Sequence, residues 1–201
     1  MMKKALIVLL TLMICTMGLV SCSSADDYVP AGYVLASSKD VDYKLYVPDT
    51  WVVDMSTGVT TAYVSSSDLS NISFMGFELD SSIININNGE GQTSSETDGE
   101  VDKDDIVSVD DYWQYYASSF EQTFSDMVYE TEGDNFLLGS NKLKAKKYVY
   151  TATVTGIKFR FLQVVAIQNK TVYIFTYTAR EEAYDNNIEK VNEILGYLEI
   201  K

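Results

Sequence analysis

Three strand-like stretches decide the fold: residues 144–154 (KAKKYVYTATV), 157–167 (IKFRFLQVVAI) and 171–179 (TVYIFTYTA). They are rich in β-branched and aromatic residues, which suit the pleated surface of a sheet. The connections between them, Thr155-Gly156 and Gln168-Asn169-Lys170, have the composition of tight hairpin turns. The sequence therefore predicts three long strands that pair antiparallel in chain order.

The pairing across the first turn predicts which side chains share a face of the sheet. One face carries the apolar residues nearest that turn: Tyr150, Ala152, Val154, Ile157, Phe159 and Phe161. The other face is predicted to carry Leu162, Val164, Val172 and Ile174. Because both faces are apolar, we expect other elements to cover both of them.

Shorter strands are predicted ahead of this sheet and a short one after it. Apolar runs alternate with turn residues, as in an antiparallel meander, at residues 33–36, 43–47, 51–55, 60–65 and 72–79. The last residues of the chain, 197–200, are expected to return as an edge strand.

Two helices are predicted, near residues 109–127 and 181–195. Each has the spacing of a capping box, Ser108 with Asp111 and Thr178 with Glu181. The first helix has an apolar stripe of Trp113, Tyr116, Ala117, Phe120, Phe124 and Met127. The second has Tyr184, Ile188, Val191, Ile194 and Leu195, and Gly196 is expected to end it. The order of elements indicates an α+β fold in which helices flank an antiparallel sheet.

The N-terminus has the layout of a signal peptide. Lys3 and Lys4 precede an uncharged apolar run at residues 5–20, which is shorter than the roughly 20 residues of a membrane-spanning helix. Leu19-Val20-Ser21-Cys22 then resembles the lipobox of bacterial lipoproteins. This resemblance implies cleavage before Cys22 and a diacylglycerol group on its sulfur. Cleavage without lipidation and retention as a membrane anchor are the alternatives.

The same patterns divide the chain. Residues 1–21 are expected to be the signal peptide, residues 22–31 a tether close to the lipid, and residues 32–201 one domain. A polar and acidic stretch near residues 85–106 is predicted to be a flexible insertion, because it has few apolar residues to bury. We expect the protein to be lipid-anchored on the extracytoplasmic side of the cell membrane or the outer membrane.

The acidic insertion also contains weak candidate ligands for Ca²⁺. Asp98, Asp102 and Asp104 gather carboxylate oxygens, the ligands that this cation prefers. The spacing is not that of an EF-hand loop, so a solvated loop is the preferred interpretation.

Two motifs in the predicted domain resemble those of the PsbP/Mog1-like proteins. Residues 43–51 (YKLYVPDTW) are similar to the opening strand of that family, and residues 172–179 (VYIFTYTA) to its closing strand. The resemblance implies a PsbP/Mog1-like sandwich over residues 32–201. In the photosynthetic members it implies a non-enzymatic role in stabilising a membrane complex, which we do not transfer because their N-terminal docking extension is replaced here by a lipobox. Trp51 is expected to be a core anchor rather than a ligand platform.

The composition restricts the chemistry. The chain has no His, and Cys15 and Cys22 are its only cysteines, so triads and metal sites built from imidazole or from several thiolates are excluded. No phosphate-binding glycine motif is present, and no cofactor is expected. A formal net charge of −14 disfavours binding to nucleic acid.

Basic residues gather on the predicted hairpin, at Lys142, Lys144, Lys158 and Arg160. They are either solvent-face charges that prevent strand aggregation, the preferred interpretation, or a docking patch for an acidic partner. From all of this we expect a non-catalytic binding or assembly module that is held to the membrane by its covalent lipid and binds an envelope protein. The alternative is a carboxylate-based extracellular hydrolase, such as a glycan-acting enzyme, because paired carboxylates can work without His.

Overall fold

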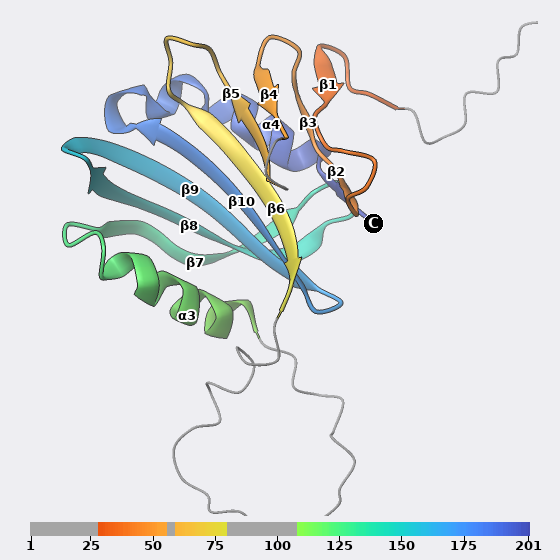
Figure 1. Cartoon of the computed structure of the whole chain (residues 1–201). Coiled ribbons are helices and arrows are strands. Elements are labelled where there is room, and N and C mark those ends of the chain that lie inside the picture. Colours follow the sequence, from red (N-terminus) through yellow and green to blue (C-terminus); the bar gives the residue numbers. More distant parts are fainter. Residues whose placement is uncertain (1–27, 56–58, 80–107) are drawn as a thin grey trace, which may run out of the picture.

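A computed structural model describes residues 28–55, 59–79 and 108–201. Within them, seven strands form one antiparallel sheet in the order β4-β5-β6-β10-β9-β8-β7 (Figure 1). The strands are β4 (Val52–Asp54), β5 (Thr60–Tyr63), β6 (Asn71–Glu78), β7 (Val128–Leu138), β8 (Leu143–Val154), β9 (Ile157–Gln168) and β10 (Thr171–Arg180). The α+β prediction, with an antiparallel sheet flanked by helices, is confirmed.

The β8–β9–β10 hairpins contain the predicted strands but differ from the prediction in one turn. The first turn and its register are as expected. The second consists of Asn169 and Lys170 alone, both with positive φ, while Gln168 pairs with Thr171 as part of β9. A shift of one residue moves the side chains of the next strand to the opposite face. The predicted face is therefore wrong for Val172 and Ile174. They lie on one face of the sheet, and Leu162 and Val164 lie on the other.

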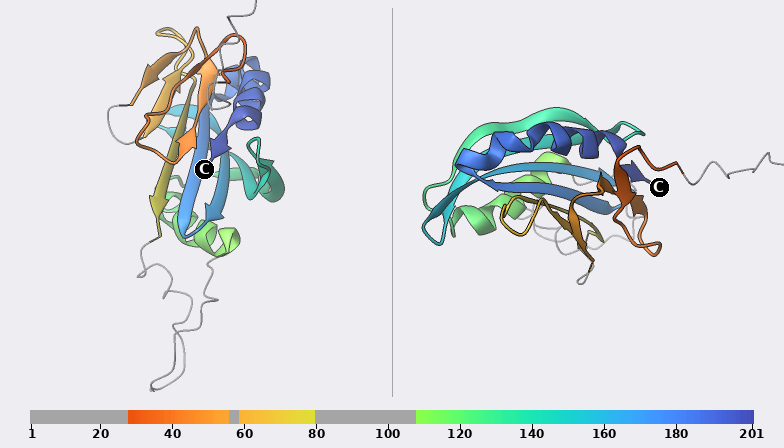
Figure 2. Two further views of the ribbon diagram at one scale, coloured as in Figure 1. Left: turned by 90° about the vertical axis from the view of Figure 1, so that its right-hand side faces the viewer. Right: turned by 90° about the horizontal axis from the view of Figure 1, so that it is seen from above.

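One face of the sheet is covered by the first and the last elements of the described residues (Figure 2). The covering elements are the short strands β1 (Tyr33–Leu35), β2 (Tyr43–Lys44), β3 (Tyr46–Pro48) and β11 (Glu199–Ile200), the 3-10 helix η2 (Glu181–Asn186) and the helix α4 (Ile188–Tyr197). Trp51 lies in this core, 8% exposed, and its backbone N–H donates to the Pro48 carbonyl at 3.0 Å. The predicted anchor role of Trp51 is confirmed.

The C-terminal helix differs from the prediction at its start. Thr178 is not a helix cap, because it belongs to β10 and pairs with Asn71 and Phe161. Residues 181–186 form a 3-10 turn, and α4 begins only at Ile188, without a side-chain cap. The expected apolar stripe is buried nevertheless, apart from the half-buried Ile188, and Gly196 lies inside the helix rather than after it.

The helix α3 (Val109–Glu121) covers part of the other face. Its predicted capping box is confirmed: Ser108 Oγ accepts from the Asp111 N–H at 3.1 Å, and Asp111 Oδ2 accepts from the Ser108 N–H at 3.3 Å. The helix ends before Phe124 and Met127, so the predicted stripe is too long at its C-terminal end.

The strand β7 is a feature that the sequence patterns do not predict. Its sequence is mostly polar, and its pairing with β8 is interrupted by irregularities between Tyr129 and Thr131 and between Thr131 and Asp134. Bulges of this kind break the alternation of apolar and polar residues by which a strand is recognised. As a result, an edge strand of 11 residues lies where the patterns indicate only a connection.

Several predictions lie outside the described residues: the signal peptide, Cys22 and the acidic insertion near residues 85–106. In the described ranges, every helix is too short or too polar to cross a membrane.

Candidate functional site

A groove lies between the start of α3 on one side and the edge strand β7 and its neighbour β8 on the other. It has two parts that share Asp110 in their walls, with volumes of about 550 Å³ and 490 Å³. The larger part is lined by Val109, Leu137, Lys144 and Lys146 among others, and we call it the Lys-flanked hollow. The smaller part is lined by Trp113, Glu121, Glu132, Gly133 and Tyr148 among others, and we call it the acidic hollow.

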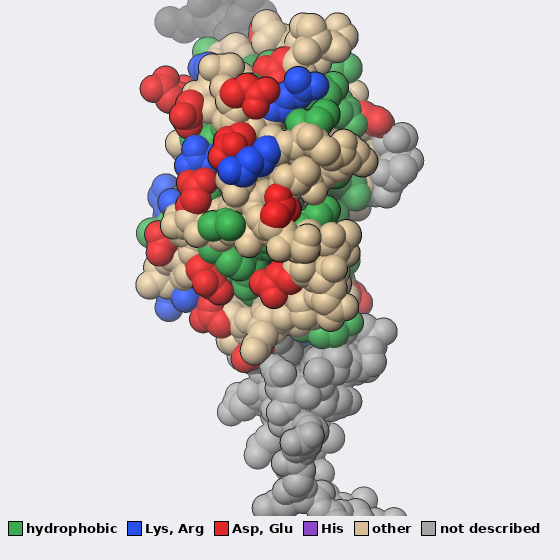
Figure 3. All heavy atoms as spheres, turned by 90° about the vertical axis from the view of Figure 1, so that its left-hand side faces the viewer, with side chains coloured by type: hydrophobic (Ala, Val, Ile, Leu, Met, Phe, Trp, Pro, Cys, Tyr) green, Lys and Arg blue, Asp and Glu red, His purple; other side chains and the backbone are tan. Residues whose placement is uncertain are grey.

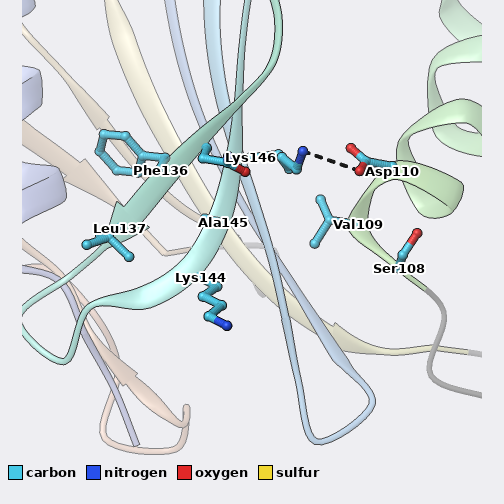
Figure 4. Close-up of a pocket in the computed structure, with 9 residues that line it drawn as sticks. Ser108, Val109, Asp110, Phe136, Leu137, Lys144, Ala145 and Lys146 are labelled. Carbon is cyan, nitrogen blue, oxygen red and sulfur yellow. Dashed lines mark ion pairs between the residues drawn. The ribbon is translucent and has the colours of Figure 1, made fainter. Parts of the chain in front are cut away.

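The register of β7 and β8 builds the strand wall of the Lys-flanked hollow. Leu137 pairs with Lys144, and Asn135 pairs with Lys146, so all four lie on the face that α3 partly covers. The helix starts at Val109 and leaves this end of the sheet open. Figure 4 shows the ion pair that spans the gap, from Lys146 Nζ to Asp110 Oδ2 at 3.3 Å. Leu137 remains 57% exposed.

A bulge in β7 shapes the acidic hollow. Thr131 pairs with Val149 and Asp134 with Lys147, so Glu132 and Gly133 together face the single residue Tyr148. Gly133 has a φ of 75°, a conformation that side-chain-bearing residues rarely adopt. The bulge therefore places a residue without a side chain directly over the Tyr148 ring.

The floor of the acidic hollow is aromatic. Tyr148 stacks on Trp113 from α3, with 3.6 Å between ring centroids, and both side chains are buried. Because the two rings cover each other, their facing surfaces are not open to a ligand. The part of the Tyr148 ring that is directed to the acidic hollow is the edge that carries its hydroxyl.

Charge in the hollow comes from carboxylates in three positions. Asp110 pairs with Lys146, and Glu121 Oε1 accepts from the Tyr129 hydroxyl at 3.0 Å. The Glu132 side chain makes neither a hydrogen bond nor an ion pair within the described residues. Burial first, and then the charges of Asp110 and Glu132, hold the pKa of Tyr148 far above its ordinary value. Its hydroxyl stays protonated at any physiological pH.

The structure does not bring the four predicted docking cations together. Lys158 pairs with Glu181 at 2.9 Å, and Arg160 pairs with Glu130 and lies over the Tyr184 ring, 4.2 Å from its centroid. Figure 3 shows this end of the molecule, where acidic and basic side chains are interspersed.

Lys142 and Lys144 lie at the opposite end of β8. They are separated from Lys158 and Arg160 by about 23 to 36 Å along the strand, at about 3.3 Å per residue. Lys144 lines the groove, and neither lysine has an ion pair with a described residue. The docking role of all four remains a prediction.

The candidate ligands for Ca²⁺ (Asp98, Asp102 and Asp104) lie outside the described residues, as does Cys22. Among the described residues, no group of three or more His, Cys, Asp or Glu side chains is arranged to hold a metal ion.

Sequence reasoning missed the groove itself. About a third of its lining residues belong to β7, which the sequence patterns indicate as a connection. Asp110 is interpreted there only as part of a helix start. The one available signal is Gly133 inside a polar run, because an isolated glycine in a strand often marks a bulge.

Comparison with known proteins supports the fold. The solution structure of the cyanobacterial PsbP protein CyanoP from Synechocystis sp. PCC 6803 is 13% identical, with a TM-score of 0.50, over 91% of this chain and 99% of that one. A variant of Mog1 is 7% identical, also with a TM-score of 0.50, over 84% of this chain and 95% of that one.

A crystal structure from Bacteroides thetaiotaomicron VPI-5482 is 9% identical with a TM-score of 0.41, and 80% of this chain spans 45% of its length. No protein-family model and no curated protein sequence matches the chain. At these identities the similarity concerns architecture alone. The chain has a PsbP/Mog1-like fold.

Proposed function

We propose that the protein is a lipid-anchored, non-catalytic binding module of the cell envelope, and that it binds an envelope protein through the groove beside α3. The observation that carries this proposal is the Lys-flanked hollow, where the exposed Leu137 and two lysines lie beside the outer edge of a sheet. Exposed apolar groups rimmed by charge are typical of protein-binding surfaces.

The edge strand supplies a second reason. In the described part of the chain, β7 pairs with β8 alone, so its other edge presents free backbone groups. An extended peptide can add to such an edge, with its backbone giving affinity and its side chains giving specificity. The bulges of β7 interrupt the regular edge and limit unspecific pairing.

The lipid anchor rests on the sequence of the N-terminus. The lipobox at Leu19 to Cys22 supports it, and a Cys-linked diacylglycerol provides the two acyl chains that stable anchoring needs. The first described residue is Tyr28, six residues after Cys22. Six residues span at most about 20 Å, so the anchor holds the domain close to the membrane surface.

A carboxylate-based hydrolase is the second candidate, and one observation favours it: Asp110, Glu121 and Glu132 line the same hollow. A glycosidase needs a general acid that is shielded from solvent. All three carboxylates are exposed, and two of them already have partners, Lys146 and Tyr129. Binding is therefore the better supported function.

The proposal is tested in two steps on the protein in its native cells. Mass spectrometry of the membrane fraction should find an acylated Cys22 at the N-terminus, and Cys22→Ala should release the protein from the membrane. Leu137→Asp should then abolish co-purification of the partner after cross-linking, whereas Leu69→Asp, at a similarly exposed leucine on another surface, should retain it. A Cys22→Ala variant that is still cleaved and still attached to the membrane would refute the anchor, and equal recovery by the two leucine variants would refute the groove.

A further inference from the structure

The acidic hollow contains a buried polar group that the fold does not satisfy. Tyr148 is 1% exposed, and its hydroxyl oxygen has no hydrogen-bond partner among the described residues. Buried hydroxyls in proteins almost always have a partner, because leaving one unpaired is unfavourable. The neighbouring Trp113 Nε1 is also buried without a hydrogen-bond partner among the described residues, but of the two only the Tyr148 hydroxyl offers an acceptor oxygen.

Two oxygen atoms, one from Asp110 and one from Tyr148, lie close to the position that a Gly133 side chain would occupy. A Cβ atom placed on Gly133 would lie 3.7 Å from Asp110 Oδ1 and 3.9 Å from the Tyr148 hydroxyl. Glycine leaves that space empty. An atom that approaches there from the hollow meets a carboxylate oxygen and a phenolic oxygen at once.

The polar groups that line the acidic hollow favour the binding of a cation. The carboxylates of Asp110, Glu121 and Glu132 and the Tyr148 hydroxyl all offer acceptor oxygens. Asp110 already binds one ammonium group, that of Lys146, at 3.3 Å. The Glu132 side chain has no partner in the described residues, so one negative charge beside the Tyr148 hydroxyl is free to bind another cation.

We propose that the acidic hollow binds the cationic side chain, Lys or Arg, of an extended polypeptide segment whose apolar side chain lies in the Lys-flanked hollow. This inference rests on the proposed function and specifies its partner. Gly133 and Leu137 are four residues apart on β7, about 13 Å along the strand. A segment lying along β7 therefore presents its basic and apolar side chains at positions i and i+4, which point to the same side of a strand.

The experiment uses matched peptides that differ in charge only. The probes are acetyl-Thr-Arg-Thr-Val-Thr-Leu-Thr-amide and the same peptide with citrulline, the neutral isostere, in place of arginine. Each is titrated at millimolar concentration into the mature ¹⁵N-labelled protein in detergent micelles. We expect saturable amide shifts around Gly133 with the arginine peptide, and about tenfold weaker binding of the citrulline peptide, as a lost charge-assisted hydrogen bond predicts.

Variants of the protein locate the effect. Tyr148→Phe and Glu132→Gln should each weaken binding of the arginine peptide by about threefold or more. The control variant Glu182→Gln changes the net charge by the same amount as Glu132→Gln, at an exposed position in η2. It should leave the affinity for the arginine peptide unchanged. Equal binding of the two peptides, absence of shifts near Gly133, or equal affinity of all variants would overturn the inference.

Two further measurements show whether the ligand is a polypeptide or a free polyamine. The outcomes also show whether a failure concerns this inference alone or the proposed function as well. The first measurement is the affinity of spermidine, and the second is the affinity of the arginine peptide with its leucine replaced by threonine. If spermidine binds as well as the arginine peptide and the leucine replacement does not lower the affinity, the hollow binds a free polyamine and the polypeptide assignment is overturned. If the peptides fail while Leu137→Asp still abolishes partner recovery, this inference is wrong and the proposed function stands. If Leu137→Asp has no effect on recovery, the proposed function itself is wrong.

Discussion

Removing the hydroxyl oxygen from each of two neighbouring tyrosines should lower the free energy of unfolding in one case only. Tyr148 and Tyr150 lie on β8, face the same core beside α3, and are 1% and 4% exposed. The Tyr150 hydroxyl donates to Gln163 Oε1 at 3.0 Å, whereas the Tyr148 hydroxyl has no partner in the described structure. Substitution by Phe keeps the ring packing of both, so the two variants differ in hydrogen bonding alone.

The expected magnitudes follow from that difference. Tyr150→Phe should lower the free energy of unfolding by about 1–2 kcal/mol, because it removes a hydrogen bond and leaves the buried Gln163 oxygen unpaired. Tyr148→Phe should leave the free energy of unfolding unchanged or raise it by about 1 kcal/mol, because it relieves the burial of an unpaired hydroxyl.

Urea denaturation, followed by circular dichroism and fitted with one common slope, measures both free energies. A loss in Tyr148→Phe as large as that in Tyr150→Phe would refute the reasoning. It would mean that ordered water or another group already satisfies the Tyr148 hydroxyl, and the acidic hollow would then have no unmet polar group.

Two other predictions concern backbone strain and alkaline pH. Gly139→Ala should lower the free energy of unfolding by about 2–4 kcal/mol in the same assay, because its Cβ would press on the Leu198 carbonyl oxygen at a positive φ. Gly156→Ala has open space at a similar φ and should cost about 1 kcal/mol; equal losses would contradict the clash. Burial raises the pKa of Tyr177 and of Tyr184 to about 12 from 10.0, so unfolding releases protons above pH 10. Stability should be full below about pH 10 and fall as the pH rises toward 12, and Tyr177 and Tyr184 should ionise only with unfolding; their ionisation in the native protein near pH 10 would be contrary evidence.

Local patterns in the sequence are sufficient for most of the fold. The α3 capping box of Ser108 and Asp111 depends on residues three apart, and both partners are visible in the sequence. The strands of the β8–β9–β10 hairpins follow from composition. Their faces depend on the length of each turn, and counting Gln168 as a turn residue is enough to misplace Val172 and Ile174.

The groove could not be predicted from local patterns. It forms where α3 meets the bulged edge strand β7, and no short window of sequence contains both. Asp110 satisfies the rule for a helix start whether or not it also lines a hollow, and Tyr148 satisfies the rule for a strand whether or not its hydroxyl is paired. The basic residues do not form a cluster for a related reason, because long strands carry Lys144 and Lys158 to opposite ends of the sheet.

Photo-cross-linking in intact cells tests the central claim most directly. Leu137 is replaced by p-benzoylphenylalanine, and Leu69 is replaced in the same way as a matched exposed position. The account predicts a single adduct at position 137, formed with a segment that carries a Lys or Arg four residues from an apolar side chain, and lost when Glu132→Lys is added. An adduct at position 69 but not at 137, or one at 137 that Glu132→Lys leaves unchanged, would contradict it.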